Sequence, residues 1–296
     1  MSAPILLSSE VEEALAAGVA VVALETAIVT HGLPIPHNLQ VAAGAADAVR
    51  RGGAIPATVA VMDGRIRIGL ETGDLERLAA GGAVKVSSRD LGPALARGVI
   101  GGTTVAATMR AASMAGIHFM ATGGIGGVHR GRPEDESADL SELVRSAVAV
   151  FCAGPKIVLD LERTLERLDT LSVPVIGYRC DQVPAFYLAS SGIAVGVRAD
   201  DAEEVASILS AAWATGSNGA LVVIPPPREL PGAEDFVRQA AAEAVDVSGP
   251  DLTPLLLARI AELSEGRSLD INVELVIHNA GVAAQSAAAY ARLGVA

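Results

Sequence analysis

The chain has 296 residues and a formal net charge of −12, a length that suits one large α/β domain or two small ones. The acidic balance and the 3% aromatic content argue against nucleic acid as a partner, because such surfaces need basic clusters or stacking rings. No apolar run is long enough to span a bilayer and no signal-peptide pattern opens the chain, so we expect neither membrane association nor a leader.

A buried strand is predicted near the N-terminus, because residues 19–24 are all apolar. Glu25 follows this strand directly, and a carboxylate at the end of a buried strand is a candidate general acid or base. An acid that merely caps a helix or braces a loop is the alternative. A proline-rich loop, THGLPIPHN, then leads into a helix predicted over residues 39–51.

A hairpin and a lysine-bearing strand are predicted next. Strands over 58–62 and 66–68 flank Asp63-Gly64, a dipeptide that suits a tight two-residue turn. Lys85 lies in the middle of a further apolar strand predicted over 83–87. A buried ammonium costs free energy unless it has an anionic partner. Lys85 is therefore a candidate site residue, with an edge-strand lysine as the alternative.

Two glycine-rich turns follow. The sequence GGTTVAATM at 101–109 predicts a glycine turn that opens a helix of small residues, which could approach a ligand or simply pack tightly. The sequence GGIGG at 123–127 follows an apolar run over 117–121. Its backbone N–H groups could converge on an anion, and an ordinary tight turn is the alternative.

Polar residues come directly after the second turn. His129 and Arg130 supply donors for a phosphate or carboxylate. Asp135, Ser137 and Asp139 supply the hard oxygen atoms that Mg²⁺ or Mn²⁺ prefers. A solvated acidic loop, with Ser137 or Asp139 as the N-cap of the next helix, explains the same residues equally well.

Lys156 is predicted to begin a helix at the end of a buried strand. The strand covers 147–152, Pro155 suits a first helical turn, and apolar residues recur at helical spacing over 157–168. The positive end of the helix dipole disfavours an ammonium, which is one way in which a lysine becomes a nucleophile or Schiff-base former. A lysine that only extends from the helix end into solvent is the alternative.

The remaining chain continues the alternation of strands and helices and contains no linker, repeat or low-complexity tract. We predict a single domain over 1–296, a three-layer α/β/α sandwich with a central, largely parallel or mixed sheet. Cys152 and Cys180 form no CxxC pair, which favours reduced thiols in a cytoplasmic protein. The further elements are predicted over 173–177, 183–189, 194–197, 202–214, 221–224, 233–245, 253–264 and 271–292.

Seven motifs, in the same order, resemble the pseudouridine-5′-phosphate glycosidase family, also called the indigoidine synthase A-like group. They are VVALETAIVTHGLPIPHN, VKVSSRDL, GGTTVAATM, ATGGIGGVHRG, ESADL, CAGPK and LVIHNAG. The resemblance implies an α/β/α fold, a homotrimer and a divalent metal cofactor, usually Mn²⁺. It also implies reversible cleavage of the C–C glycosidic bond of pseudouridine 5′-phosphate to uracil and ribose 5-phosphate.

The resemblance also implies roles for individual residues. Lys156 matches the lysine that attacks the anomeric carbon of ribose, Glu25 matches the proton donor, and Asp135 matches the metal-binding aspartate. We expect substrate contacts from a further set of residues, namely Lys85, Val105, His129, Ser137, Ala138, Asp139 and Asn279.

Several positions depart from the family pattern, among them Ala27, Ile157, Pro225 and His278. Because these departures surround matching catalytic residues, two enzymatic functions remain open. One is the glycosidase, and the other is a C-glycosynthase that attaches ribose 5-phosphate to an aromatic acceptor. A non-enzymatic binder of sugar phosphates is a third possibility, but such a protein would not need Lys156 in an unfavourable position.

Overall fold

The computed structural model describes residues 4–244 and 252–294. Within these residues, eleven strands form one mixed sheet, whose main path runs β1-β4-β3-β2-β7-β10-β14-β12-β13. In that order, these strands are Ile5–Leu7, Arg65–Ile68, Ile55–Met62, Val21–Leu24, Phe119–Ala121, Ala149–Cys152, Ala220–Val223, Val175–Tyr178 and Val197–Ala199. Two more strands, β6 (Gly101–Thr103) and β5 (Val84–Val86), join the sheet through β3.

The centre of this sheet is parallel. Each neighbouring pair from β3 to β13 along the path runs in the same direction. Within β2, Val22 and Leu24 pack into one hydrophobic cluster, whereas Val21 and Ala23 pack into another on the opposite face. Helices that cover both faces explain why this strand is apolar at every position.

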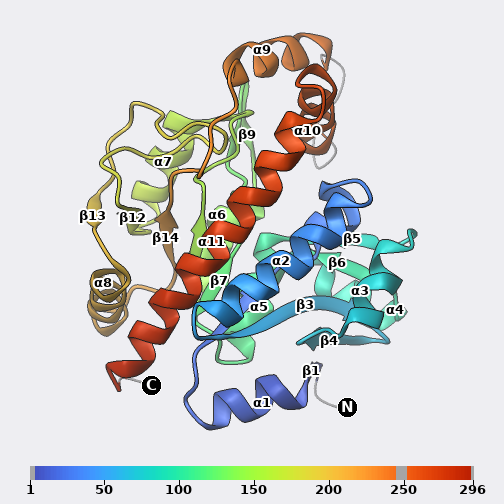
Figure 1. Ribbon diagram of the computed structural model, residues 1–296, viewed down its shortest axis with the longest axis vertical. Helices are drawn as coiled ribbons and strands as arrows, with labels where there is room; N and C mark the ends of the chain where they lie inside the picture. The colour runs from blue at the N-terminus through green and yellow to red at the C-terminus, as the bar shows by residue number, and fades with distance from the viewer. Residues whose placement is uncertain (1–3, 245–251, 295–296) are drawn as a thin grey trace.

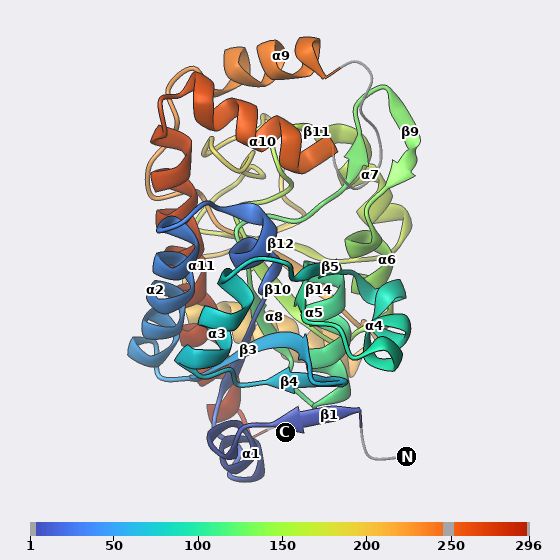
Figure 2. The ribbon, with the colours of Figure 1, turned by 90° about the vertical axis from the view of Figure 1, so that its right-hand side faces the viewer.

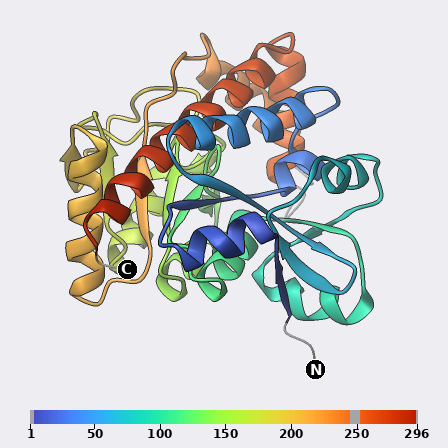
Figure 3. The same ribbon diagram turned by 60° about the horizontal axis from the view of Figure 1, so that its bottom comes forward.

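One face of the sheet is covered by α2 (His37–Arg51), α8 (Ala202–Ala214), α10 (Leu252–Leu263) and α11 (Arg267–Arg292). The long helix α11 runs beside α2 (Figures 1 and 3). The helix α9 (Ala233–Glu243) packs on α10, and α3 (Thr72–Ala79) contacts α2.

The other face is covered by a second group of helices (Figure 2). These are α1 (Ser9–Ala16), α4 (Leu91–Arg97), α5 (Val105–Met114), α6 (Ala138–Arg145) and α7 (Leu161–Thr170). A small antiparallel sheet of β11 (Leu159–Asp160), β8 (Val128–His129) and β9 (Arg132–Glu136) lies beyond the main sheet. The predicted three-layer α/β/α class is therefore confirmed, with a mixed sheet that is parallel at its centre.

Local predictions had mixed outcomes. The hairpin at Asp63-Gly64 is confirmed, and the positive φ angles of 53° and 72° at its two residues are those that such a turn requires. Residues 101–103 form a strand, so the glycine turn predicted there is wrong. Residues 183–189 contain neither helix nor strand, and Val245 lies outside the described residues. No helix in 4–244 or 252–294 has the length and apolar character to cross a membrane.

Candidate active site

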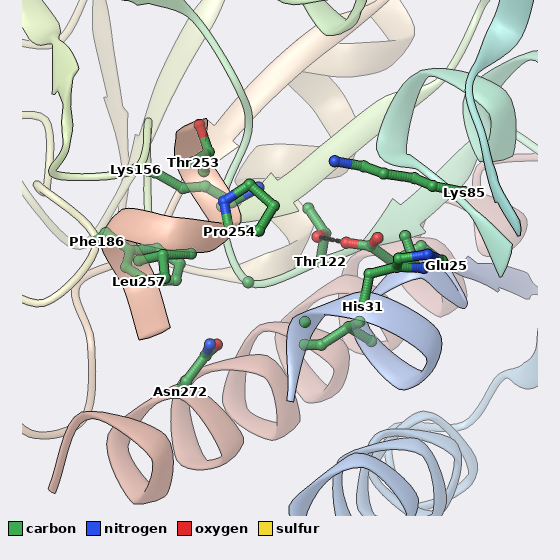
Figure 4. Close-up of a pocket in the computed structure, with 15 residues that line it drawn as sticks. Glu25, His31, Lys85, Thr122, Lys156, Phe186, Thr253, Pro254, Leu257 and Asn272 are labelled. Atoms are coloured by element: carbon green, nitrogen blue, oxygen red, sulfur yellow. Dashed lines mark hydrogen bonds between the residues drawn. The ribbon is translucent and has the colours of Figure 1, made fainter. Parts of the chain in front are cut away.

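A cavity lies at the edge of the sheet where the parallel strands end (Figure 4). It has an empty volume of about 630 Å³, part of which is open to solvent. Glu25 follows β2, Thr122 follows β7, and Lys156 comes from the loop after β10. The carboxyl ends of parallel strands are the usual place for a ligand in such a sheet.

Strand register brings Glu25 and Thr122 side by side. Leu24 pairs with Ala121 in the parallel ladder of β2 and β7, so the next residue of each strand occupies the same position at the sheet edge. The Thr122 hydroxyl donates a hydrogen bond to Oε1 of Glu25 (Figure 4). Sequence patterns did not identify Thr122, although it is the first residue after an apolar strand, as Glu25 is.

Burial raises the pKa of Glu25 above the usual 4.5. The charge of Lys156 and the hydrogen bond from Thr122 oppose this rise without cancelling it. Behind the carboxylate lies a second empty space of about 330 Å³ with a largely apolar lining that includes Leu24, Val41 and Val276. This apolar surrounding on one side of the carboxylate disfavours its charged form and favours the neutral, proton-bearing acid.

Lys156 is held in a loop and not in a helix. The helix α7 begins at Leu161, so the predicted helix start at Lys156 and the helix-dipole argument are both wrong. The backbone N–H of Lys156 donates to Ile125 O at 3.1 Å, which ties the loop to the glycine turn. Ile157 is buried in the core at 2% exposure, so its apolar character reflects tertiary packing and not the face of a helix.

Lys85 and Lys156 reach into the cavity from opposite sides (Figure 4). Among the described strands, β5 pairs with β6 alone. Lys85 therefore lies on an edge strand, which was the alternative to its being a site residue. Its charge nevertheless acts on Glu25 and on His31, two other residues of the cavity wall. Lys85 therefore lies both on an edge strand and in the wall of the cavity.

The glycine turn is braced by Asp139. One carboxylate oxygen of Asp139 accepts from the backbone N–H of Gly126 at 2.8 Å, and the other accepts from Ala106 at 2.9 Å. A Cβ on Gly126 would overlap the Ser137 hydroxyl, so a glycine is needed at this close approach. The turn thus binds a carboxylate of its own chain, while Gly123 and Gly124 line the cavity.

The acidic loop caps the following helix. Ser137 is the N-cap of α6, and its hydroxyl accepts from the Asp139 N–H at 3.2 Å. Val105 is buried at 3% exposure as the first residue of α5. None of Val105, Ser137, Ala138 and Asp139 is among the residues that line the cavity, so their substrate contacts stay predictions.

His129 connects the acidic loop to the cavity wall. Its Nδ1 lies 3.3 Å from Oδ2 of Asp135, and its Nε2 lies 3.2 Å from the Thr253 hydroxyl. Thr253 belongs to α10 and lines the cavity (Figure 4). Asp135 therefore lies behind this wall, two contacts away from the open space.

The donor set around Asp135 suits a hydrated ion. Among the described residues, no group of three or more His, Cys, Asp or Glu side chains could hold a metal ion. Asp135 is partly accessible, with 30% of its side chain exposed. A hard divalent cation that keeps most of its water needs no more than one or two carboxylates from the protein, so Asp135 fits such an ion.

The long helix α11 contributes two asparagines near the glycine turn. The Asn279 Nδ2 donates to Thr122 O at 2.9 Å. This predicted substrate-binding residue therefore supports the backbone of Thr122, whose hydroxyl binds Glu25. Asn279 is fully buried and is not among the cavity-lining residues. Asn272 lies two turns earlier on the same helix and lines the cavity.

Several lining residues were missed by sequence reasoning, namely Thr122, His31, Phe186, Thr253, Leu257 and Asn272. His31 belongs to a short π-helix over Ile28–Gly32, a distortion that often marks functional sites. Burial and the charge of Lys85 lower the pKa of His31. Phe186 has a backbone φ of 60°, an unusual value for a bulky residue that no local sequence signal predicts.

Comparisons with known proteins show which family the chain is similar to. The family described as indigoidine synthase A like protein matches residues 10–289. The chain is 50% identical to the pseudouridine-5′-phosphate glycosidase of Sorangium cellulosum, over 97% of this chain and 94% of that protein. It is 52% identical to the enzyme of the same name from Paracoccus denitrificans, over 97% and 98% of the two chains.

Two solved structures are also similar. The crystal structure of the prealnumycin C-glycosynthase AlnA in complex with ribulose 5-phosphate has a TM-score of 0.91 and 33% identity, and the match covers 99% of each chain. An indigoidine synthase A-like protein from Thermotoga maritima has a TM-score of 0.88 and 32% identity, over 96% of this chain and 95% of that one.

Proposed function

The chain belongs to the indigoidine synthase A-like family, and from this we propose that it is a pseudouridine-5′-phosphate glycosidase that works through an imine on Lys156. The reaction cleaves the C–C bond between uracil and ribose 5-phosphate. The observation that carries the proposal is the shared cavity of Glu25, a carboxylic acid with a raised pKa, and Lys156, an amine placed across the same space.

The chemistry of the bond explains the need for both groups. Ordinary glycosidases protonate an oxygen that bridges the sugar and its leaving group. A C–C glycoside has no such oxygen, so protonation must occur on the base carbon while electrons are supplied from the sugar side. A nitrogen bound to the anomeric carbon can supply those electrons by becoming an iminium.

The steps follow from this arrangement. The amine of Lys156 bonds to C1′ as the C1′–O4′ bond breaks, and O4′ takes the proton that this nitrogen loses. Glu25 then gives its proton to the ring carbon of uracil, the C1′–carbon bond breaks, and the nitrogen lone pair forms the iminium. Water hydrolyses the iminium to the aldehyde of ribose 5-phosphate and releases Lys156. A proton from this water restores neutral Glu25.

Charge in the cavity suits the sugar phosphate. Lys85 approaches from the wall opposite Lys156 and supplies a cation for the phosphate group (Figure 4). His31 lies on the same wall and can donate a hydrogen bond to phosphate in either protonation state. Glu25 lines the same cavity and accepts from Thr122, the residue before the glycine turn, so the base would leave on that side.

We assign to Asp135 the role of holding a hydrated divalent ion, most simply Mn²⁺ or Mg²⁺. When bound, the ion would add positive charge beside the acidic loop and so favour the sugar phosphate. His129 would hold the segment that carries this carboxylate, because its Nδ1 lies 3.1 Å from the backbone O of Asp135 and 3.3 Å from Oδ2. The covalent steps use Glu25 and Lys156.

A second candidate is a C-glycosynthase that joins ribose 5-phosphate to an aromatic acceptor. The likeness to AlnA favours it, and the apolar space behind Glu25 offers room beyond a uracil ring. Ala27, one of the departures from the family pattern, lines the cavity. The higher identity to the curated glycosidases favours the first candidate.

The test is direct. Purified protein is incubated with pseudouridine 5′-phosphate and Mn²⁺, and released uracil is measured by chromatography. Uracil formation, and its reversal with uracil and ribose 5-phosphate, supports the glycosidase. Absence of both, with ribose 5-phosphate still trapped on Lys156 by borohydride, would favour the C-glycosynthase.

A further inference from the structure

The side chain of Asn272 has unused hydrogen-bonding capacity at the cavity. Asn272 is 7% exposed, and its Oδ1 is buried with no hydrogen-bond partner. Across residues 4–244 and 252–294, its amide takes part in no hydrogen bond, whereas Asn279 on the same helix donates to Thr122 O. A buried amide without a partner is uncommon, because the group has lost its hydrogen bonds to water.

Asn272 extends from α11 toward the cavity (Figure 4). A Cβ built on Gly123 would lie 3.2 Å from Asn272 Oδ1, so the amide lies against the glycine turn. Thr122, the neighbour of Gly123, holds Glu25 by its hydroxyl. The amide is thus joined to the proton donor through two consecutive residues of one turn.

The walls near Asn272 are apolar. Phe186 and Leu257 line this part of the cavity, and the Phe186 ring lies against Gly124 (Figure 4). Lys85 and His31 line the opposite part, beyond Glu25 (Figure 4). One side of the cavity therefore carries Lys85 and His31, which suit a phosphate. On the other side, apolar walls and the Asn272 amide lie on the same side as Lys156 and suit a planar ring with polar edges (Figure 4).

We propose that Asn272 determines base specificity by pairing with the imide edge of the nucleobase, where a carbonyl and an N–H are adjacent. Oδ1 accepts from the ring N–H. Oδ1 now lies against Gly123, and a half-turn of the terminal amide exchanges its oxygen and nitrogen, so Asn272 can turn Oδ1 toward the cavity without movement of the helix. This inference rests on the proposed function and adds a residue that reads the base.

The experiment compares uracil with 1-methyluracil and 3-methyluracil in the synthetic direction, with ribose 5-phosphate as co-substrate. Each methyl group removes one ring N–H. In the wild type, we expect kcat/KM to fall roughly 10- to 100-fold for 3-methyluracil, which lacks the imide N–H, and not for 1-methyluracil, which keeps it. In Asn272→Leu, we expect kcat/KM for uracil to fall by a similar factor, while that for 3-methyluracil changes little. The ratio between the two bases should then approach one.

Two further variants separate recognition from structure. Asn272→Asp keeps the size of the side chain and an acceptor for the ring N–H, so it should keep the preference for uracil that Asn272→Leu loses. Ser286→Ala is the matched control, because Ser286 is another buried residue of α11 with an unpartnered oxygen and does not line the cavity. It should keep the wild-type ratio. Borohydride trapping of ribose 5-phosphate should stay unchanged in all three variants, since this step involves no base.

The outcomes are distinct. A wild-type ratio that persists in Asn272→Leu would overturn the inference, as would loss of the ratio in Asn272→Asp or a wild-type enzyme that accepts 3-methyluracil as well as uracil. If the wild type forms no product from uracil but still traps ribose 5-phosphate, the glycosidase assignment itself fails. If trapping is lost in the Asn272 variants alone, Asn272 serves the sugar site or the fold and the inference is wrong.

Discussion

The hydroxyl of Thr122 donates a hydrogen bond to the carboxylate of Glu25, and this contact links the ends of the neighbouring strands β7 and β2. The bond favours the ionised form of Glu25, whereas burial favours the neutral form. Burial prevails, so the pKa of Glu25 is raised. The acid therefore retains its proton at a pH where an exposed glutamate would have lost it.

Thr122→Val should move the alkaline limb of the pH–rate profile to higher pH. The substitution removes a hydrogen bond that stabilises the carboxylate, so the pKa of Glu25 should rise further. Because Glu25 acts as an acid, activity falls as pH rises through this pKa. The profile of kcat/KM measures the shift. Ser286→Ala, at a buried residue of α11 that lines neither empty space, is the control and should leave the limb in place. A limb that moves to lower pH would contradict the assignment.

Glu25→Gln should separate bond cleavage from covalent attachment. Glutamine has a similar shape but no acidic proton, so uracil release should fall by about 10²- to 10⁴-fold. Ribose 5-phosphate should still form an imine, because this step needs the amine of Lys156. Chromatography measures the first effect, and mass spectrometry after borohydride reduction measures the second. A variant that retains cleavage would exclude Glu25 as the proton donor.

The same mutation should alter the pH dependence of stability. The raised pKa of Glu25 means that the folded protein binds this proton more tightly than the unfolded chain does. The wild type should therefore lose stability as pH rises from about 4.5, the usual value, towards the raised value. Glu25→Gln should not show this loss, so its free energy of unfolding should rise relative to that of the wild type as the pH increases. Urea unfolding at a series of pH values tests the sign.

Lys156→Arg should abolish imine trapping. Arginine keeps the positive charge, but its guanidinium does not lose a proton and cannot attack the sugar. The reduced adduct, one sugar phosphate per chain, should be absent from the mass spectrum. Lys85→Ala should weaken binding of ribose 5-phosphate yet still allow trapping at a saturating concentration. The opposite pattern would identify Lys85 as the nucleophile.

Asp135→Ala should lose the divalent ion while the fold persists. Calorimetry or Mn²⁺ paramagnetic resonance should show much weaker binding, with unchanged circular dichroism. EDTA should abolish wild-type activity and Mn²⁺ should restore it. Glu134→Ala is the matched control, because Glu134 is an exposed acid of the same strand and should leave ion binding intact. Full activity after complete metal removal would exclude a metal requirement.

Much of the site could be predicted because a short sequence signal marks it. Glu25 and Lys156 each follow an apolar run, and parallel strands bring such ends to one edge. The helix expected at Lys156 was wrong because helical spacing also arises when loop residues, such as Ile157, are buried by the core. Asp139 could not be separated from metal ligands by sequence, since its partners Ala106 and Gly126 meet it through tertiary packing.

The contribution of α11 was beyond local patterns for another reason. Its alanine-rich sequence predicts a helix, but several of its faces are buried, so periodicity does not show which residues meet the edge of the sheet. Asn272 and Asn279 point to the glycine turn because α11 packs across β2, β7 and β10. That packing follows from the whole fold.

The position of α11 also bears on how the protein is made. Ribosomes release a chain from its N-terminus, so β2, β7 and β10 emerge long before residues 267–292. Until then, one apolar face of the sheet lacks the part of its cover that α11 supplies, and the cavity lacks the side chain of Asn272. We expect nascent chains that stop before α11 to expose this face, to bind chaperones and to be inactive.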